Sequence, residues 1–245
     1  MTHDDSETTN VSPAASLPED LADSDLTVAA NQFLDEDSAL AWLQHAELPP
    51  DLVEKLSKNS VATKSRKVKL AIVNHPKAPR YLSLSLIRRL FTFDLMQVAL
   101  APAVAGDLKR AAEEVLINRL ETISAGEKLS LAHRASGRVA GELLLDAEPR
   151  IIAAALENPR LTEALVTNAL LHHEASFALV QTVCGHSKWS LRREIRIALL
   201  RNQHTPAEHA VEFAKFLPND VVREILQNSK LPENLKTCLT QGVQP

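Results

Sequence analysis

A short phrase, an apolar helical stretch that closes on asparagine, recurs along this chain. The clear examples end at Asn74, Asn158, Asn202 and Asn228, and a weaker one ends at Asn118. A helix-starting residue follows the clear examples after four or five positions: Pro79, Thr162, Pro206 and Pro232. Asparagine tolerates the left-handed conformation that ends a helix, and proline suits a helix's first turn. The asparagine spacings of 44, 40, 44 and 26 residues predict stacked pairs of short antiparallel helices, an all-α solenoid.

The amino-acid composition favours helices over sheets. The 245 residues are 45% hydrophobic, with six glycines and 4% aromatics, whereas sandwiches and barrels need turn glycines and aromatic or β-branched strands. Two cysteines, Cys184 and Cys238, are too few for a disulfide framework and indicate a reducing compartment. The N-terminus lacks a secretory signal, and no apolar run approaches the roughly 20 residues of a membrane span. We therefore expect a soluble, cytoplasmic protein with no membrane partner.

Charge is unevenly divided along the chain. Residues 1–54 hold 13 Asp or Glu and no Lys or Arg, whereas the remainder holds 18 acidic and 27 basic residues. Residues 1–36 have too few large apolar side chains to repay the entropy of ordering. We predict a disordered acidic tail over 1–36 and a single solenoid domain over 37–245. The tail either keeps the protein soluble or folds back over the basic body until a partner displaces it.

Apolar spacing and breaker residues predict short helices joined by connectors of about two to five residues. We place them near 38–46, 50–57, 67–74, 79–92, 94–101, 107–119, 125–135, 138–146, 149–157, 161–171, 175–184, 189–201, 206–216, 219–228 and 232–240. Two helix starts have specific signals: a capping box at Ser124–Glu127, and a second box at Thr205–Glu208 with Pro206 in the first turn. Asp37 is a candidate N-cap for the first helix.

The segment from Ile152 to Thr162, an apolar run followed by Asn158-Pro159, resembles the repeats of the leucine-rich-repeat-variant, HEAT and armadillo solenoids. The resemblance extends over about residues 65–240, although the other turns read Asn-His-Pro, Asn-Gln-His and Asn-Ser-Lys. Such families act as scaffolds and adaptors that hold partners on a concave surface. The resemblance therefore implies a HEAT- or armadillo-like superhelix with that role, and it transfers no catalytic residue.

Candidate catalytic and metal-binding groups are sparse. Cys184-Gly185-His186 offers two ligand types, but structural zinc needs four ligands at regular spacing. His172-His173-Glu174 contains the chain's single His-Glu dipeptide, whereas the helical-repeat deoxyhypusine hydroxylases bind iron through several such pairs. We interpret the first segment as a helix end and the second as a polar connector. The sequence predicts no catalytic residue, no metal and no cofactor.

Basic residues supply the candidate binding surface. Lys188, Arg192 and Arg196 are spaced four apart and would share one face of a helix. Trp189 and Arg193 are also four apart and would stack beside that face. The alternative interpretation is a solvated face whose charges pair with neighbouring carboxylates.

A second basic group consists of Arg66, Arg110 and Arg150. Each lies eight residues before the asparagine of its repeat. If the repeats stack in register, these arginines form a column, and a basic column suits a phosphate backbone.

Three classes of function follow from these patterns. The leading expectation is a non-enzymatic scaffold or adaptor that binds a protein or peptide on its concave face. The alternative is a nucleic-acid-binding protein that uses its basic body and is autoinhibited by the acidic tail; few aromatics are available for base stacking. A helical-repeat enzyme ranks third, and it requires a deep pocket with convergent polar groups.

Overall fold

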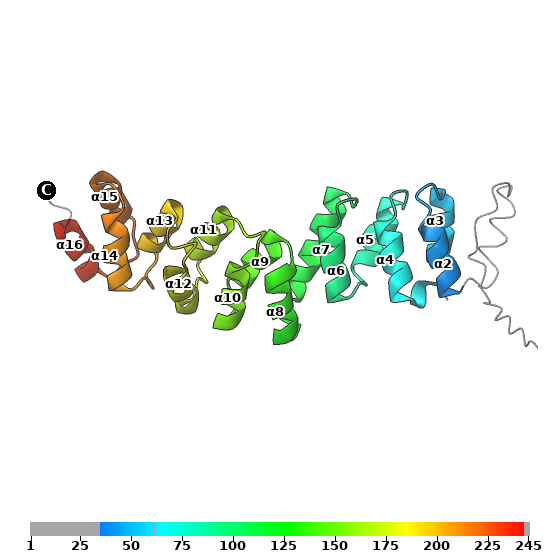
Figure 1. Cartoon of the computed structure of the whole chain (residues 1–245), viewed down its shortest axis with the longest axis horizontal. Coiled ribbons are helices and arrows are strands. Elements are labelled where there is room, and N and C mark those ends of the chain that lie inside the picture. Colours follow the sequence, from blue (N-terminus) through cyan, green and yellow to red (C-terminus); the bar gives the residue numbers. More distant parts are fainter. Residues whose placement is uncertain (1–34, 61, 243–245) are drawn as a thin grey trace, which may run out of the picture. The chain divides into compact units, whose positions relative to one another are not determined.

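The computed structural model describes residues 35–60 and 62–242, which are helical and contain no strand (Figure 1). The chain divides into two compact units, residues 1–90 (unit 1) and residues 91–245 (unit 2). The prediction of an all-α fold is confirmed. Most of the predicted acidic tail lies outside the described residues. Its last two residues, Asp35 and Glu36, respectively cap and begin the first described helix.

Unit 1 is organised around a central helix, α4. Its described helices are α2 (Glu36–Leu43), α3 (Pro50–Lys58), the 3-10 helix η1 (Ala62–Lys64), α4 (Arg66–Asn74) and α5 (Arg80–Ile87). Helix α4 packs against α2, α3 and α5, and it contributes Val68, Ile72 and Val73 to the buried core. Three buried apolar residues in a nine-residue helix form one apolar face, as is usual for an amphipathic helix at the surface of a protein.

Unit 2 is a succession of short helices. They are α6 (Thr92–Leu100), α7 (Gly106–Arg119), α8 (Ala125–Arg134), α9 (Gly137–Leu143), α10 (Pro149–Leu156), α11 (Glu163–Leu171), α12 (Phe177–Cys184), α13 (Arg193–Arg201), α14 (Ala207–Lys215), α15 (Asn219–Gln227) and α16 (Glu233–Gly242). Together with unit 1, every helix predicted from the sequence has a counterpart. The largest shift in a start is at α13, which begins at Arg193 instead of residue 189.

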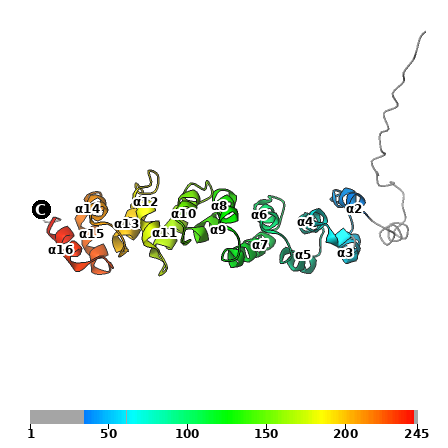
Figure 2. The same cartoon turned by 90° about the horizontal axis from the view of Figure 1, so that it is seen from below.

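From α9 onward, the helices of unit 2 other than α14 pack against the helix two positions earlier in the chain. Helices α9, α11, α13 and α15 follow one another in one row, and α8, α10 and α12 in a second. Figure 2 shows α10 and α12 on one side of this unit and α11 and α13 on the other. Helices of eight or nine residues are unstable alone, so each depends on the neighbours before and after it in its row.

One close approach between helices requires glycine. A Cβ atom added to Gly137, the first residue of α9, would lie 2.3 Å from the carbonyl oxygen of Arg160. That oxygen belongs to the connector between α10 and α11, which therefore lies directly against the start of α9. A Cβ atom added to Gly126 in α8 would have no atom within 4 Å, so packing does not require glycine there.

The three predicted helix starts have different outcomes. The capping box at Ser124 is confirmed, with the side chain of Glu127 returning to the Ser124 backbone. The predicted box at Thr205 is wrong, because the buried Thr205 hydroxyl donates to Leu199 O at 2.6 Å and Pro206 is the N-cap of α14. The Asp37 cap is also wrong, since Asp35 accepts the N–H of Ser38 and α2 begins two residues earlier than predicted.

Candidate functional site

Two asparagines of the recurring phrase, Asn158 and Asn202, connect neighbouring helices of a row. Asn158, which follows α10, is fully buried. Its Nδ2 donates to Ala132 O at 2.7 Å and to Ala135 O at 3.2 Å, at the end of α8. Its Oδ1 accepts the N–H of Arg160 at 2.8 Å, which closes the connector after α10. One side chain thus satisfies carbonyls that the end of a helix leaves without partners.

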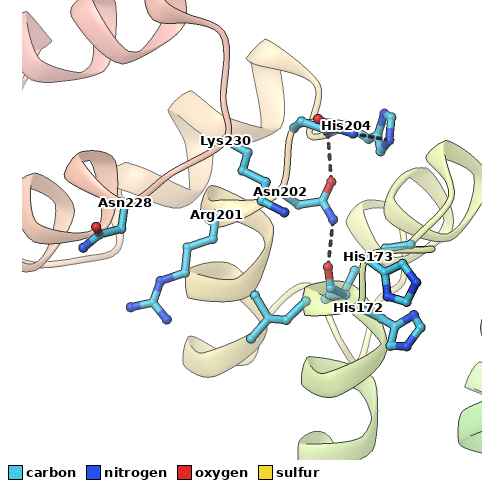
Figure 3. A pocket seen from close by; sticks show the side chains of 11 residues that line it. His172, His173, Arg201, Asn202, His204, Asn228 and Lys230 are labelled. Carbon is cyan, nitrogen blue, oxygen red and sulfur yellow. Dashed lines mark hydrogen bonds between the residues drawn. The ribbon is translucent and has the colours of Figure 1, made fainter.

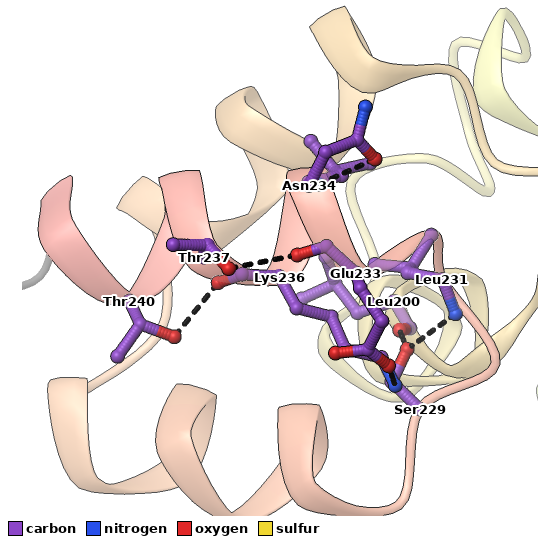
Figure 4. Close-up of polar contacts among 9 residues, drawn as sticks. Leu200, Ser229, Leu231, Glu233, Asn234, Lys236, Thr237 and Thr240 are labelled. Atoms are coloured by element: carbon purple, nitrogen blue, oxygen red, sulfur yellow. Dashed lines mark hydrogen bonds and ion pairs between the residues drawn. The ribbon is translucent and has the colours of Figure 1, made fainter.

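The same arrangement recurs at the ends of α13 and α15. Asn202 donates to Leu170 O at 2.8 Å, at the end of α11, and accepts the N–H of His204 at 2.9 Å (Figure 3). Ser229 replaces asparagine after α15: its hydroxyl donates to Leu200 O at 2.5 Å and accepts the N–H of Leu231 (Figure 4). We call Asn158, Asn202, Ser229 and their counterpart in unit 1 the bridging residues.

The counterpart in unit 1 is a histidine. His75 accepts the N–H of Lys77 on Nδ1, and its Nε2 lies 3.0 Å from His45 O, beyond the end of α2. Its neighbour Asn74 is the last residue of α4 and makes no bridge of this kind. Asn118 likewise lies inside α7. The bridging position is therefore occupied by Asn, His or Ser, whichever can both donate and accept.

The sequence interpretation of these asparagines was wrong in its mechanism. Asn202 is the C-cap of α13 at φ −92° and Asn228 is that of α15 at φ −109°, neither in the left-handed region. The recurrence arises because the carbonyls at the end of the preceding helix in the row are buried and need a donor. The sequence pattern identified these residues but not their partners, which lie about 23 to 32 positions away in the chain.

A pocket lies where α11, α13 and α15 end. Its volume is about 170 Å³, and it is lined by residues 170–173 and 175, residues 201–204, Asn228 and Lys230. We call this side of unit 2 the connector edge. Figure 3 shows the side chains of Arg201 and of the histidines on opposite sides of Asn202. These cationic and titratable groups do not converge on one point, as groups acting on a single reacting atom must.

Exposed apolar side chains border this pocket. Leu171 is 47% exposed and Phe177 is 55% exposed, and the Phe177 ring meets that of His204 edge-on with centroids 6.3 Å apart. We call Leu171, His172, His173, Phe177 and His204 the connector patch. Large apolar groups that remain in water at the rim of a hollow are typical of contact sites.

Three residues of the connector edge have metal-ligand chemistry. His172, His173 and Glu174 place ligand atoms within 4.8 Å of one another, and all three are exposed. Nδ1 of His172 already accepts the N–H of Glu174 at 3.3 Å. Ligands of a built metal site are held by buried partners, and these three side chains are 40% to 79% exposed. They form the polar connector expected from the sequence.

Both cysteines lie outside this region. Burial, with a smaller contribution from the charge of Glu212, raises the pKa of the Cys184 thiol to about 12. At ordinary pH this thiol is protonated and unreactive. Cys238 is exposed on α16.

The predicted basic face around α13 does not form as expected. Lys188 lies in a turn before the helix and Arg192 is its N-cap, so neither shares a helical face with Arg196. Arg193 is the first helical residue and is exposed. It is Lys188, not Arg193, that lies over the Trp189 ring, with Nζ 4.1 Å from the centroid.

Trp189 explains why α13 starts late. Its side chain is 2% exposed, and Nε1 donates to Leu156 O at 2.9 Å, at the end of α10. This bond holds the indole against α10 in the turn that precedes α13. Arg196 is also engaged, since Nε donates to Ser190 O at 2.8 Å and the guanidinium lies 4.3 Å from the Phe216 ring centroid. Sequence spacing alone does not contain these contacts.

The second predicted group is distributed over both units. Arg66 begins α4 in unit 1, whereas Arg110 lies in α7 and Arg150 in α10 of unit 2. Helix α9 packs against both α7 and α10. Arg150 pairs with Glu148 at 2.8 Å. Their alignment in a column stays a prediction.

The excess of basic over acidic residues is confined to residues 55–90 of unit 1. Residues 55–90 contain ten Lys or Arg and no Asp or Glu, whereas residues 91–245 contain 17 basic and 18 acidic residues. The excess over the body that the sequence indicated is thus confined to the end of α3, η1, α4 and α5. The residues predicted around α13 lie in the balanced part of the chain.

Comparison of the chain with protein families, with curated proteins and with solved structures finds no match. Among the described residues, no helix has the length and apolarity that a membrane crossing requires.

Proposed function

We propose that this chain is an α-solenoid of the HEAT- and armadillo-like kind and acts as a non-enzymatic scaffold for a protein or peptide. The packing of helices on those two positions earlier supports the solenoid, because translational stacking is what distinguishes it from a bundle. The bridging residues support it further: each joins the end of one helix to the end of its predecessor in the row. We also propose that the helices follow a superhelical path and that the partner binds on its concave face.

The connector patch carries the functional proposal. Phe177 and Leu171 offer apolar area in a setting of His172, His173 and His204, with Arg201 and Lys230 in the adjoining pocket. A matching segment has one or two apolar side chains flanked by carboxylates. Aromatic and leucine anchors beside basic groups provide both buried area and orientation.

The same pocket supports binding over catalysis. The Arg201 side chain points away from the histidines (Figure 3), and both polar ends of the Asn202 amide are already occupied. The protonated, buried Cys184 is no nucleophile. We therefore assign no catalytic residue, metal or cofactor to this chain.

The test is affinity capture from nuclease-treated lysate of the source cell. The full chain is compared with the double variant Leu171→Ser, Phe177→Ser. The control is Leu191→Ser, a 67% exposed leucine before the opposite end of α13. We expect the double variant to lose captured proteins roughly tenfold or more, the effect of about 1.4 kcal/mol, while the control retains them. Equal capture by all three chains, or recovery of no protein, contradicts the proposal.

Nucleic-acid binding is the second candidate function. The observation that favours it is the run of ten Lys or Arg without an acidic residue over 55–90. Phosphate backbones are bound through such charges, and the affinity falls steeply as salt increases. Under this candidate, unit 1 is the binding surface and not the region around α13.

Its test uses the full chain with the acids before residue 35 neutralised, which we call the segment-neutral variant. The substitutions are Asp4→Asn, Asp5→Asn, Glu7→Gln, Glu19→Gln, Asp20→Asn, Asp23→Asn and Asp25→Asn. Deleting residues 1–54 would instead remove α2 and half of α3. We expect the variant to bind a single-stranded oligonucleotide roughly tenfold more tightly than the natural chain at low salt. Failure of both chains to bind at low salt excludes this candidate.

A further inference from the structure

The basic surface of unit 1 takes its carboxylate partners from the N-terminal side of the chain. Lys67 Nζ lies 3.4 Å from Glu36 Oε1, Lys77 Nζ lies 2.5 Å from Glu47 Oε2, and Lys58 Nζ lies 2.7 Å from Glu54 Oε1. The hydrogen bond from Lys77 lowers the pKa of Glu47, and that from Lys58, with a smaller one involving Tyr81, lowers the pKa of Glu54. In each pair, a lysine of unit 1 binds a carboxylate that precedes it in the chain.

These carboxylates do not balance the surface. Residues 35–90 contain ten Lys or Arg against six Asp or Glu, a net charge of +4. Eight of the ten cations are exposed: Lys58, Lys64, Arg66, Lys67, Lys77, Arg80, Arg88 and Arg89. We call these eight the basic surface. The first turn of α4 contains no acidic residue and two of these cations, although the helix dipole favours the opposite sign there.

The segment before residue 35 has the complementary charge. Residues 1–34 contain seven Asp or Glu and no Lys or Arg, and all seven lie between Asp4 and Asp25. The segment therefore carries −7, and together with the +4 of residues 35–90 it gives unit 1 a net charge of −3. The seven negative charges of this segment are more than enough to neutralise the net charge of +4 on residues 35–90.

The segment also joins the structure beside the basic surface. Asp35 caps α2, and the next residue, Glu36, pairs with Lys67 in the first turn of α4. The nearest acid of the segment, Asp25, precedes Asp35 by ten residues, a length of chain that spans up to about 35 Å. Helix α4 has nine residues and is about 13 Å long. The connection is therefore long enough for the acids to reach either end of α4.

We infer that the acidic segment, residues 4–25, binds the basic surface of unit 1 within the same chain. Tethering favours this occupant over a separate polyanion, because a short linker gives an effective concentration of about a millimolar or more. The inference is independent of the connector patch, and it holds whether or not the chain binds nucleic acid. It predicts that another polyanion must displace the segment before it reaches Arg66 or Lys67.

The test measures paramagnetic broadening of backbone amide signals in the full chain. A spin label is attached at Ser16→Cys in a Cys238→Ser background, where the protonated, buried Cys184 remains unlabelled. At about 0.01 M salt we expect the amides of α4 and α5 to lose roughly half or more of their intensity. At about 0.5 M salt the Debye length is only a few ångströms, and we expect the intensity to return.

Two matched variants, both with four cations replaced by glutamine, locate the contact. Replacement of Lys64, Arg66, Lys67 and Arg80, four residues of the basic surface, is expected to abolish the broadening. Replacement of Arg110, Lys188, Arg192 and Arg193 in unit 2 is expected to leave it unchanged. The segment-neutral variant also loses it. Broadening that is absent at low salt, indifferent to these charges, or centred on unit 2 overturns the inference. If the spin label causes no broadening but an added oligonucleotide shifts the amide signals of α4, the occupant of the basic surface is nucleic acid. That result also overturns the inference.

Discussion

Units 1 and 2 use the same internal connection but present different surfaces. His75 reaches back to His45 in unit 1 as Asn158 reaches back to Ala132 in unit 2. Residues 55–90 nevertheless contain no acidic residue, whereas residues 91–245 balance 17 basic against 18 acidic residues. Buried donors and acceptors therefore set how successive helices connect, and they leave the sign of the surface charge free. Changes to buried positions should therefore be large and insensitive to salt, and changes to the basic surface small and dependent on it.

The two tryptophans allow each unit to be followed separately. Trp42 lies in α2 of unit 1, and the buried Trp189 lies in unit 2. The Trp42→Phe background therefore reports on unit 2, and the Trp189→Phe background on unit 1. Coincident urea transitions of the two reporters would support the single domain predicted from the sequence.

Gly137→Ala should have the largest effect. The new methyl group would meet the Arg160 carbonyl oxygen at 2.3 Å, so backbone must move, at a cost of about 3 kcal/mol in the free energy of unfolding of unit 2. The measurement is urea denaturation followed by Trp189 fluorescence. Gly126→Ala, with open space around it, is the control and should stabilise by about 0.5–1 kcal/mol. Equal effects of the two substitutions would show that the close approach is not present.

Asn158→Ala tests the bridge in unit 2. It leaves two carbonyls at the end of α8 and the N–H of Arg160 without their partner, which should destabilise unit 2 by about 2–3 kcal/mol. The loss should be the same at low and high salt. Asn118→Ala is the control, because Asn118 is an exposed residue within α7. If Asn118→Ala destabilises unit 2 as much as Asn158→Ala, the bridge of Asn158 is not the cause of the loss.

His75→Ala tests whether unit 1 relies on the same connection. The substitution removes one acceptor and one donor to His45 O, and we expect a loss of about 1–2 kcal/mol in the Trp42 transition. Asn74→Ala, at the neighbouring residue, should cost less. If the two substitutions are reversed in rank, asparagine and not histidine makes the connection in unit 1.

Lys128→Met tests a half-buried ion pair of unit 2. Partial burial of Asp146 opposes ionisation, but hydrogen bonds from Lys128 Nζ at 2.8 Å and from the N–H of Glu148 outweigh it and lower the pKa of Asp146. The stabilisation is therefore present above the ordinary value of 3.8 and is lost as the pH falls through the lowered pKa. We expect a loss of about 1 kcal/mol at neutral pH that shrinks below pH 3.8. A difference that does not change with pH would assign the effect to packing of the lysine stem.

Lys67→Gln should have the smallest effect. Its pair with Glu36 is 3.4 Å long, with side chains 75% and 44% exposed, so we expect a change of less than about 0.5 kcal/mol in the Trp42 transition. Unlike the bridge variants, this one should approach the natural chain as salt is added. A salt-independent loss above about 1 kcal/mol would mean that the basic surface contributes to the core of unit 1.

The positions of the helices were accessible from the sequence because their signals are local. Pro50, Pro149 and Ser124 mark starts within a turn of where they occur, and the apolar stripe between them has the period of a helix. Asn158 and Asn202 also marked helix ends where a bridge forms, whereas at Asn74 and Asn228 the next residue makes it. The role of the asparagines was not accessible, since the carbonyls that Asn158 and Asn202 satisfy come from the preceding helix of the row.

The candidate site was less accessible for the same reason. Leu171, Phe177 and His204 have no common motif, and only the stacking of α11 and α13 brings them to one edge. The region around α13 is the opposite case. Regular spacing predicted a basic helical face there, but residues 188–192 precede the helix and Trp189 bonds to Leu156 O.

By itself the sequence determined an all-helical chain of short elements, their order, and the confinement of its basic excess to residues 55–90, because helix propensity, breakers and formal charge are properties of neighbouring residues. Only the tertiary structure decided which polar side chains are buried and which carbonyls they serve. It also decided which apolar side chains remain exposed. These depend on contacts between segments about 23 to 33 residues apart, and burial makes such contacts costly to lose.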